Sequence, residues 1–302
     1  MKIAFLILCH IDEKHIERLA NKLTKNEKFY VFIHVDKRSN IDKFTDLLKN
    51  NKSVIFTEKR YSISWGGYSA IRATMELIKC SMKHGDFDRY VLLQGLDYPL
   101  KSNKYIYEFF EQNKDVEFIR GCDISNSKEK YFYSRCRYYL FYEKINLFKK
   151  IFNYITYKLD IKLRDGYIKI DKKRYSVFWG SAQWALTRDC IDYIIKYYDN
   201  NKKFNKYFKT MFPVDELYFS TIVFNSSFKT HTVQGGCEEE KKGLVNWRNI
   251  HYFEYPQKIK VFSLEDFEML KQRDELFVRK VNSSTSKLLL DKIDEIHLEK
   301  NK

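Results

Sequence analysis

The sequence predicts an α/β fold with a mostly parallel central sheet and helices on both faces. Two observations support this prediction. In the first half of the chain, short apolar runs alternate with stretches whose apolar residues recur at helical spacing, and this alternation is typical of parallel sheets. Hydrophobic residues make up 44% of the 302 residues, which is enough to bury the core that such a sheet requires.

The elements are expected in a regular order. Apolar runs predict strands at residues 2–8, 30–35, 53–56 and 90–94, and helical spacing predicts helices at 14–25, 67–83 and 104–113. A regular pattern resumes at 177–184, and a helix is expected at 189–198. A further helix is expected to start near Pro213 and to carry Asp215 and Glu216. Ligands of such folds bind beyond the carboxyl ends of the strands, so side chains that follow the strands are candidate site residues.

Two segments depart from this pattern. Residues 125–173 are rich in Tyr, Phe and Lys and lack clear periodicity, so we expect an insertion with helical pieces that lie over the sheet. The segment from 256 is basic and ends in charged residues that are expected to fray. Since no repeat or linker divides the chain, residues 1–302 are expected to form a single domain.

Composition narrows the class of partner. The net charge is +15, from 55 Lys and Arg against 40 Asp and Glu, and so basic a protein usually meets nucleic acid, a membrane surface or a phosphorylated substrate. General surface lysine is the simpler explanation for most of this charge. We also expect peripheral attachment to an anionic membrane.

The expected compartment is the cytoplasm, peripheral to the inner face of the membrane. The six cysteines show no CxxC spacing, which excludes a zinc ribbon or redox motif. The apolar amino terminus leads into His10 without a small-residue cleavage site, which favours a buried strand over a signal peptide. No stretch approaches the roughly 20 apolar residues that span a bilayer.

Polar residues follow two of the predicted strands. Asp36 ends the strand at 30–35, the place where a doubly wound fold binds a uracil or ribose, although a turn cap is the simpler interpretation. Trp65 and Gly66 precede the long helix at 67–83, where glycine permits close approach of a ligand and a helix amino terminus favours negative charge. A tight loop with a packed Trp explains the same pattern.

Acidic residues flank the strand at 90–94. Asp97 follows it and is expected at the site, whereas metal-dependent sugar transferases present an Asp-x-Asp pair at such a strand end. The only Asp-x-Asp here, Asp86-Phe87-Asp88, precedes the strand and would fall at the wrong end of the sheet. We therefore interpret it as unrelated to metal binding.

Asp215 and Glu216 form the acidic pair after Pro213. Acidic residues in a first helical turn commonly stabilise the helix dipole, and this suits Asp215. Glu216 would instead project into a cleft and take a proton from an acceptor hydroxyl, which is the work of a general base.

Basic residues of the carboxyl-terminal segment are candidates for neutralising a pyrophosphate. They are Lys258, Lys260, Arg279 and Lys280. Lys or Arg can take the place of a divalent cation beside a developing negative charge, although for any one lysine a solvated surface position is the simpler interpretation.

Taken together, these fragments resemble the core-2/I-branching family, which contains β-1,6-N-acetylglucosaminyltransferases and peptide O-xylosyltransferases (glycosyltransferase family 14). Each fragment is weak alone, but their order along nearly the whole chain is specific. They are the first strand with His10, Phe32-Ile33-His34-Val35-Asp36, Trp65-Gly66-Gly67, Gly95-Leu96-Asp97-Tyr98-Pro99-Leu100-Lys101, Phe178-Trp179-Gly180-Ser181-Ala182-Gln183-Trp184, Val214-Asp215-Glu216-Leu217-Tyr218-Phe219, Asn246-Trp247-Arg248 and Leu276-Phe277-Val278-Arg279-Lys280.

The resemblance implies a GT-A-type fold and an inverting transfer of a sugar from a UDP-sugar to a hydroxyl, with no cofactor and no obligatory metal. It assigns the catalytic base to Glu216, uridine contact to Asp36 and diphosphate contact to Lys280, shared with Lys258. By the same resemblance, the other donor-binding residues are His10, Trp65, Gly66 and Asp97. The acceptor side is assigned to Gly180, Ser181, Asp215, Trp247 and Arg248.

The single domain then divides by role. Residues 1–124 form the nucleotide-binding half, 125–173 the insertion, 174–255 the acceptor and catalytic half, and 256–302 the basic carboxyl-terminal segment. The donor stays open between UDP-GlcNAc and UDP-xylose, because the Trp65 and Leu217 fragments lean towards the xylosyltransferases. The expected acceptor is a glycan, a lipid-linked sugar or a polysaccharide.

Two other functions fit parts of the sequence. A protein that binds single-stranded nucleic acid would use the basic charge and stack bases on Tyr and Phe, but no known nucleic-acid-binding motif appears and the basic residues are dispersed. No nucleic acid is therefore expected as a partner. A metal-dependent transferase would use Asp86 and Asp88, and EDTA would abolish its activity.

Overall fold

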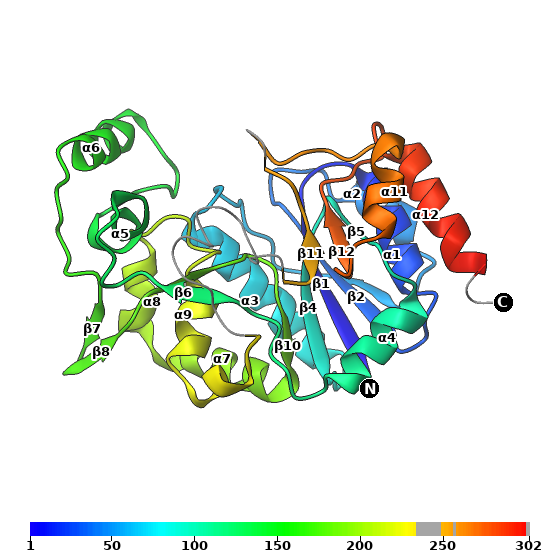
Figure 1. Cartoon of the computed structure of the whole chain (residues 1–302), viewed down its shortest axis with the longest axis horizontal. Helices are drawn as coiled ribbons and strands as arrows, with labels where there is room; N and C mark the ends of the chain where they lie inside the picture. Colours follow the sequence, from blue (N-terminus) through cyan, green and yellow to red (C-terminus); the bar gives the residue numbers. More distant parts are fainter. Residues whose placement is uncertain (234–248, 256–257, 300–302) are drawn as a thin grey trace.

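A five-stranded sheet forms the centre of the molecule (Figure 1). The computed structural model describes residues 1–233, 249–255 and 258–299. The sheet has the order β10-β4-β1-β2-β3, in which β4, β1, β2 and β3 are parallel neighbours and β10 is antiparallel to β4. The strands are β1 (Ile3–Cys9), β2 (Phe29–Val35), β3 (Val54–Phe56), β4 (Arg89–Gln94) and β10 (Ala185–Thr187). The predicted mostly parallel α/β fold is confirmed.

Apolar side chains on both faces explain why these strands are central. In β1, Ile3, Phe5 and Ile7 belong to one hydrophobic core. Ala4 and Leu6, which point the opposite way, belong to the other. A strand that is buried on both faces requires a continuous apolar run, and this is why the sequence predicts β1 and its neighbours well.

Helices cover both faces of this sheet, as predicted. Figure 1 shows α3 (Tyr68–Lys83) on one side and α1 (Glu13–Leu23) and α2 (Asp42–Leu48) on the other. The core on the α3 side is completed by α7 (Arg188–Asn200), α8 (Lys202–Phe208) and α9 (Tyr218–Phe224). The core on the α1 side is completed by α4 (Asn103–Gln112), α11 (Phe267–Lys271) and α12 (Lys287–Glu299). Short 3-10 helices lie at Ser227–His231 and Leu264–Asp266.

The carboxyl-terminal segment is part of the folded core. Its strand β12 (Phe277–Arg279) lies between β11 (His251–Tyr252), which precedes the segment, and β5 (Asp97–Pro99) in a second sheet of the order β11-β12-β5. In α12, Asp291 and Asp294 each form an ion pair of 2.7 Å with Arg18 of α1. These ion pairs and the buried face of α12 hold the segment as far as Glu299. The charged residues after Glu299 lie outside the described residues, so the fraying of the chain end stays a prediction.

Residues 125–173 lie at one end of the molecule rather than over the sheet, which corrects the predicted placement (Figure 1). They form α5 (Lys130–Arg137), α6 (Leu147–Lys158), β7 (Ile168–Ile170) and most of β8 (Lys173–Tyr175), which pairs with β7 in an antiparallel hairpin. A second antiparallel pair, β6 (Gly121–Asp123) with β9 (Phe178–Gly180), lies on either side of this segment in the sequence.

No helix in the described part of the chain is both long enough and apolar enough to cross a membrane. The described cysteines carry free thiols, namely Cys9, Cys80, Cys122, Cys136 and Cys190. Cys237 lies outside the described residues.

Candidate active site

A cavity of about 570 Å³ opens at the carboxyl ends of the central strands, and we call it the central cavity. Leu8 near the end of β1 and Gln94 at the end of β4 lie in its wall. This is the edge at which a parallel sheet binds ligands, and the structure agrees with the prediction. Among the predicted site residues, the cavity collects His10, Trp65, Ser181, Asp215, Glu216 and Lys280.

Glu216 lies in the turn before α9, whose first residue is Tyr218. The prediction that a helix begins near Pro213 and carries Glu216 is therefore wrong. Two contacts to β9 hold Glu216. Its carbonyl oxygen accepts a 2.8 Å hydrogen bond from the backbone N–H of Gly180, and its Oε2 accepts one of 2.5 Å from Nε1 of Trp179. A carboxylate fixed in this way at a cavity wall is placed for general-base work.

Asp215 borders the cavity next to Glu216. Burial, followed by the negative charge of Glu216, raises the pKa of Asp215 to about 7. Its Oδ1 is buried and accepts no hydrogen bond within the described residues. A carboxyl group with this pKa gains or loses its proton near neutral pH, so the charge of the cavity changes there. Glu216, in contrast, is fixed by two hydrogen bonds to β9.

The substitution Asp215→Asn is expected to stabilise the protein at alkaline pH. Because the folded pKa lies above the ordinary value of 3.8, the wild type loses stability as pH rises from about 4 to about 7, and the neutral amide does not. At about 1.36 kcal/mol per pKa unit, the gain in free energy of unfolding at pH 8 is roughly 2–4 kcal/mol.

Urea unfolding at pH 5 and pH 8 measures this difference. The exposed Asp46 on α2 supplies the matched control, Asp46→Asn. A gain for Asp215→Asn that is equal at both pH values would contradict a raised pKa in the folded state.

Arg135 is a residue of the cavity that the sequence did not single out. Its guanidinium lies 3.9 Å from the ring centre of Trp179 and 4.6 Å from that of Tyr131. Burial lowers the pKa of Arg135, and the negative charge of Glu216 opposes this effect. A cation that contacts two aromatic rings near Glu216 is placed to attract an anionic group. Its segment lacks periodicity, and no sequence signal could have found it.

Asp97 lies behind the cavity wall, with no exposed surface. Its carboxylate accepts a 2.7 Å hydrogen bond from Arg279 and lies 3.1 Å from Nε2 of His251. Burial alone would raise the pKa of Asp97, but Arg279 and His251 lower it to about 2. Asp97 is thus not among the residues that line the cavity, and its carboxylate holds Arg279, which does line it; the contact of Asp97 with a donor stays a prediction.

Arg279 and Lys280 bring positive charge to the central cavity. Burial and the neighbouring Arg279 lower the pKa of Lys280. Lys258 is exposed and does not line the cavity. Lys260 is engaged elsewhere, at 2.6 Å from Asp266. The predicted pairing of Lys280 with Lys258 is thus not seen, and among the described residues Arg279 and Arg135 are the other cations in the cavity wall.

The loop of Trp65 and Gly66 joins the wall that contains Glu216. Trp65 is 79% exposed and its ring lies edge-on to Phe212, at 5.1 Å between centres. The carbonyl of Gly66 accepts a 2.8 Å hydrogen bond from Val214. Gly66 has φ of +63°, and a Cβ added there would lie 2.3 Å from the Phe212 ring. Glycine is therefore required at this position, as a support rather than as a lining residue.

Asp36 directly follows β2, is buried and does not line the central cavity. Its oxygens accept hydrogen bonds from the Arg38 guanidinium and from the backbone N–H of Ile63. Burial would raise the pKa of Asp36, but these hydrogen bonds lower it to about 2. Through its contact with Ile63, Asp36 shapes the loop that follows β3. His10, another predicted donor-binding residue, is exposed at the edge of the central cavity.

The acceptor-side residues have separate roles. Ser181 lines the cavity and donates a 2.9 Å hydrogen bond to Gln183. Gly180 is buried, and a Cβ added to it would lie 1.9 Å from the carbonyl oxygen of Arg120, so only glycine fits beside β6. Trp247 and Arg248 lie outside the described residues.

The Asp-x-Asp sequence lies at the opposite edge of the sheet. Asp86 pairs with Arg188 at 2.7 Å, and Asp88 accepts a 2.6 Å hydrogen bond from the backbone of Lys2, where β1 begins. This agrees with its predicted place at the amino ends of the strands. In the part of the chain that the structure describes, no three His, Cys, Asp or Glu residues are grouped so that they could hold a metal ion.

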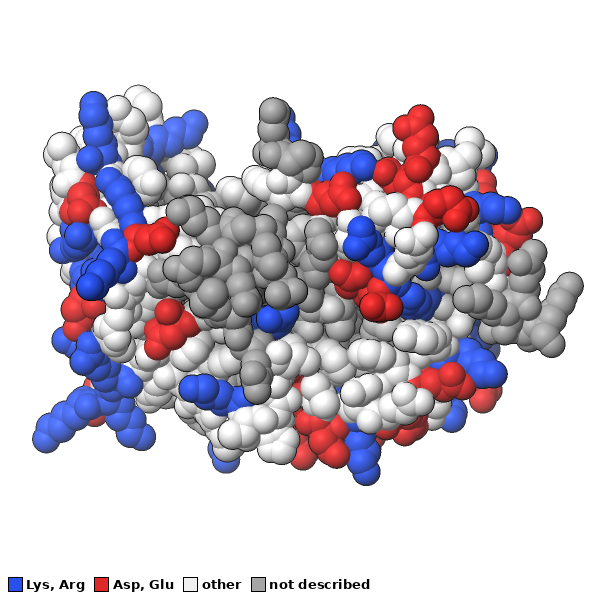
Figure 2. All heavy atoms as spheres, viewed as in Figure 1, with Lys and Arg blue, Asp and Glu red and all other residues white. Residues whose placement is uncertain are grey.

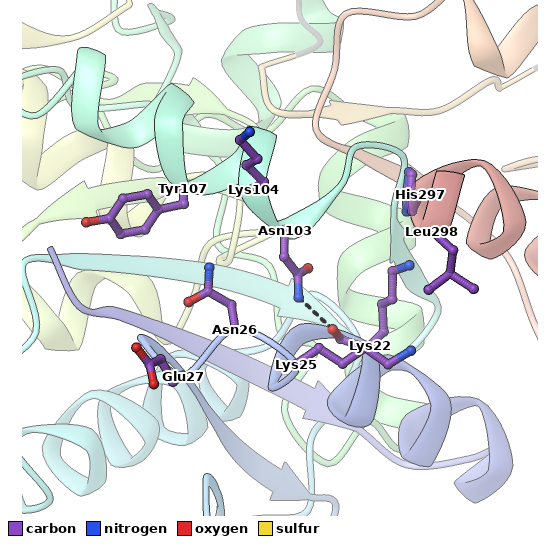
Figure 3. Close-up of a pocket in the computed structure, with 9 residues that line it drawn as sticks. All are labelled: Lys22, Lys25, Asn26, Glu27, Asn103, Lys104, Tyr107, His297 and Leu298. Carbon is purple, nitrogen blue, oxygen red and sulfur yellow. Dashed lines mark hydrogen bonds between the residues drawn. The ribbon is translucent and has the colours of Figure 1, made fainter. Parts of the chain in front are cut away.

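A second cavity, of about 390 Å³, lies between α1, α4 and the end of α12 (Figure 3). Lys22, in its wall, forms an ion pair of 2.8 Å with Asp294. The side chain of Asn103 donates a 2.7 Å hydrogen bond to the carbonyl of Lys22, drawn as the dashed line in Figure 3. None of the predicted site residues lines this cavity, and its walls join helices rather than the carboxyl ends of strands. The central cavity is therefore the candidate active site.

The sequence profile of the family described as "Branch: Core-2/I-Branching enzyme" matches residues 3–271. The chain belongs to this family. Among curated relatives of this core-2/I-branching protein, xylosyltransferase 2 of Mus musculus is 25% identical over 321 residues, which cover 97% of this chain and 33% of that protein. Xylosyltransferase 1 of Rattus norvegicus is 23% identical over 317 residues, which cover 97% and 35%. The chain thus spans about a third of these relatives.

One solved structure that matches part of the chain is that of TarS of S. aureus, at 15% identity and a TM-score of 0.29, with 65% of this chain and 38% of that chain covered. So small an overlap supports no inference about function. The mostly parallel sheet with helices on both faces is the architecture that the GT-A-type prediction required of this core-2/I-branching protein.

Proposed function

We propose that the protein is an inverting glycosyltransferase that moves a sugar from a UDP-sugar to a hydroxyl of a glycan, a lipid-linked sugar or a polysaccharide. The observation that carries this proposal is the central cavity. There the fixed carboxylate of Glu216 and the cations Arg279 and Lys280 share one space at the carboxyl edge of the sheet. Family membership supports the same chemistry.

Glu216 is the proposed base. The acceptor hydroxyl attacks the anomeric carbon from the side opposite the diphosphate and gives its proton to Glu216. The bond from that carbon to the diphosphate oxygen breaks, and UDP departs with the electron pair. One displacement of this kind inverts the configuration and needs only one carboxylate. The hydrogen bond from Trp179 to Oε2 orients the carboxylate of Glu216 at the cavity wall.

Arg279 and Lys280 are the proposed stabilisers of the leaving diphosphate. Preorganised cations beside a developing charge lower the barrier to reaction. The ion pair with Asp97 fixes the Arg279 guanidinium, and Lys280 follows it directly at the cavity wall. We include metal-free action in the proposal because these two side chains supply positive charge where a divalent ion would otherwise act.

Calorimetric titration of UDP in EDTA is the experiment that tests this proposal. We expect micromolar binding, and binding about 10–100-fold weaker in Lys280→Ala, because a hydrogen bond to a charged group contributes about 1.5–3 kcal/mol. Lys260→Ala is the matched control, since Lys260 pairs with Asp266 and Glu254 outside the cavity. Binding that requires manganese would contradict metal-free action, and no binding with or without metal would contradict the nucleotide site.

The donor sugar is proposed to be xylose or N-acetylglucosamine. The matched relatives are named xylosyltransferases, which favours UDP-xylose. Since this chain spans about a third of their length, their acceptors are not assumed. The release of UDP from UDP-xylose and from UDP-GlcNAc, measured side by side at equal concentration, decides between the two donors.

A further inference from the structure

Helix α6 exposes its apolar side chains to solvent, and the two side chains that it buries are polar. Of its 12 residues, the buried ones are Asn153 and Thr156. The side chain of Asn153 forms hydrogen bonds of 2.9 and 3.0 Å with the backbone of Phe141. Ordinary surface helices bury their apolar face instead. These hydrogen bonds fix the orientation of α6, so the inverted arrangement is built into the fold.

The exposed apolar surface extends beyond the helix itself. Phe148 is 83% exposed, Leu147 68% and Tyr154 63%. Eleven large hydrophobic side chains between residues 145 and 163 are exposed, namely Ile145, Leu147, Phe148, Ile151, Phe152, Tyr154, Ile155, Tyr157, Leu159, Ile161 and Leu163. Single exposed apolar residues are common, but a contiguous group of this size marks a surface that another apolar phase covers.

Positive charge is interleaved with this apolar surface. Residues 144–163 contain five lysines and one acidic residue, Asp160, which pairs with Lys162 at 3.0 Å. The lysines are Lys144, Lys149, Lys150, Lys158 and Lys162. In Figure 2, Lys and Arg side chains lie among uncharged ones at the end of the molecule that α6 occupies in Figure 1.

We propose that α6 and its flanks, residues 144–163, bind in the interface of an anionic phospholipid bilayer. A 12-residue helix is about 18 Å long and cannot cross a hydrocarbon core of about 30 Å. Apolar and aromatic side chains inserted among the headgroups, with lysines at the phosphates, are the arrangement of an interfacial helix. In a symmetric pair of copies, the same lysines would face one another, which favours the bilayer as the partner.

Residues just before α6 contact residues at the central cavity, which suggests a function for the exposed apolar surface. Just before α6, the ring of Tyr142 stacks at 3.7 Å on Phe212, which lines the cavity. The backbone N–H of Lys144 donates a 3.3 Å hydrogen bond to Ser64, next to Trp65. A bilayer at α6 would therefore lie close to the cavity, where an acceptor carried on a lipid would enter. The binding itself does not depend on the proposed function.

Co-sedimentation with vesicles of phosphatidylcholine, with and without 30% phosphatidylglycerol, tests the proposal. The test variant is Leu147→Ser/Phe148→Ser/Ile151→Ser. The control is Leu264→Ser/Leu288→Ser/Leu298→Ser, whose side chains are 44%, 63% and 56% exposed and lie away from α6. Circular dichroism and analytical ultracentrifugation without vesicles accompany each variant.

We expect the wild type and the control to bind the anionic vesicles at least about ten-fold more tightly than the neutral ones, and the test variant to lose about ten-fold or more. Equal binding by the test variant and the control would overturn the proposal, because the charge alone would then suffice. A wild-type dimer that the test variant dissociates, with no binding to vesicles, would overturn it in favour of a second copy of the chain.

Discussion

Replacing Glu216 by glutamine is expected to lower the rate of sugar transfer by about 10²–10⁴-fold and to leave UDP binding unchanged. The amide has the size of the carboxylate and can still accept the hydrogen bond that Trp179 donates to Oε2. The backbone contact with Gly180 is also kept. Only the capacity to take a proton is lost, so the effect falls on the chemical step.

Initial rates of UDP release with acceptor, together with UDP calorimetry, separate these two effects. Glu265→Gln, at an exposed position outside the cavity, serves as the control. If Glu216→Gln lost UDP binding, Glu216 would be a donor ligand and not the base. If the rate stayed within a few-fold of the wild type, another residue of the cavity would be the base.

Replacing Asp97 by asparagine is expected to destabilise the fold by about 3–5 kcal/mol, since removal of one partner leaves the other buried charge uncompensated. The side chain of Arg279 is 12% exposed and pairs with Asp97 at 2.7 Å. UDP binding is expected to weaken as well, because Arg279 would no longer be held at the cavity wall.

The pH dependence of unfolding identifies the cause. The folded pKa of Asp97 is about 2, below its ordinary value of 3.8, so this carboxylate contributes stability that is complete above about pH 4 and is lost as pH falls towards 2. The difference between wild type and Asp97→Asn, measured by urea unfolding, should therefore shrink between pH 5 and pH 3. A difference that does not change with pH would assign the loss to packing instead of charge.

The central strands were predictable because both of their faces are buried. The predicted strand at 2–8 is Ile3–Cys9, and the one at 90–94 is Arg89–Gln94. Segment 125–173 was not predictable in the same way, since α6 buries Asn153 and exposes Phe148. The apolar side chains of α6 face solvent. A prediction that assigns apolar residues to the core therefore placed the segment over the sheet, which is wrong.

The site was predictable in its location but not in its division of roles. Glu216 and Lys280 were found through short motifs, and both line the central cavity. The motif around Asp97 did not reveal that Arg279 and His251 form hydrogen bonds with its carboxylate. Arg135 depends on how α5 packs on Trp179. Such contacts join residues far apart in the chain, and spacing along the sequence does not record them.

The walls of the central cavity come from separate stretches of the chain. Tyr131 and Arg135 belong to segment 125–173, whereas Glu216 is held by Trp179 and Gly180, which lie just after it. Because Tyr131 and Arg135 also contact the ring of Trp179, a change in this segment reaches Glu216 through one shared side chain. An engineered exchange of the segment between family members would therefore have to keep the side chains that pack on Trp179, while positions on its solvent-exposed side stay open to change.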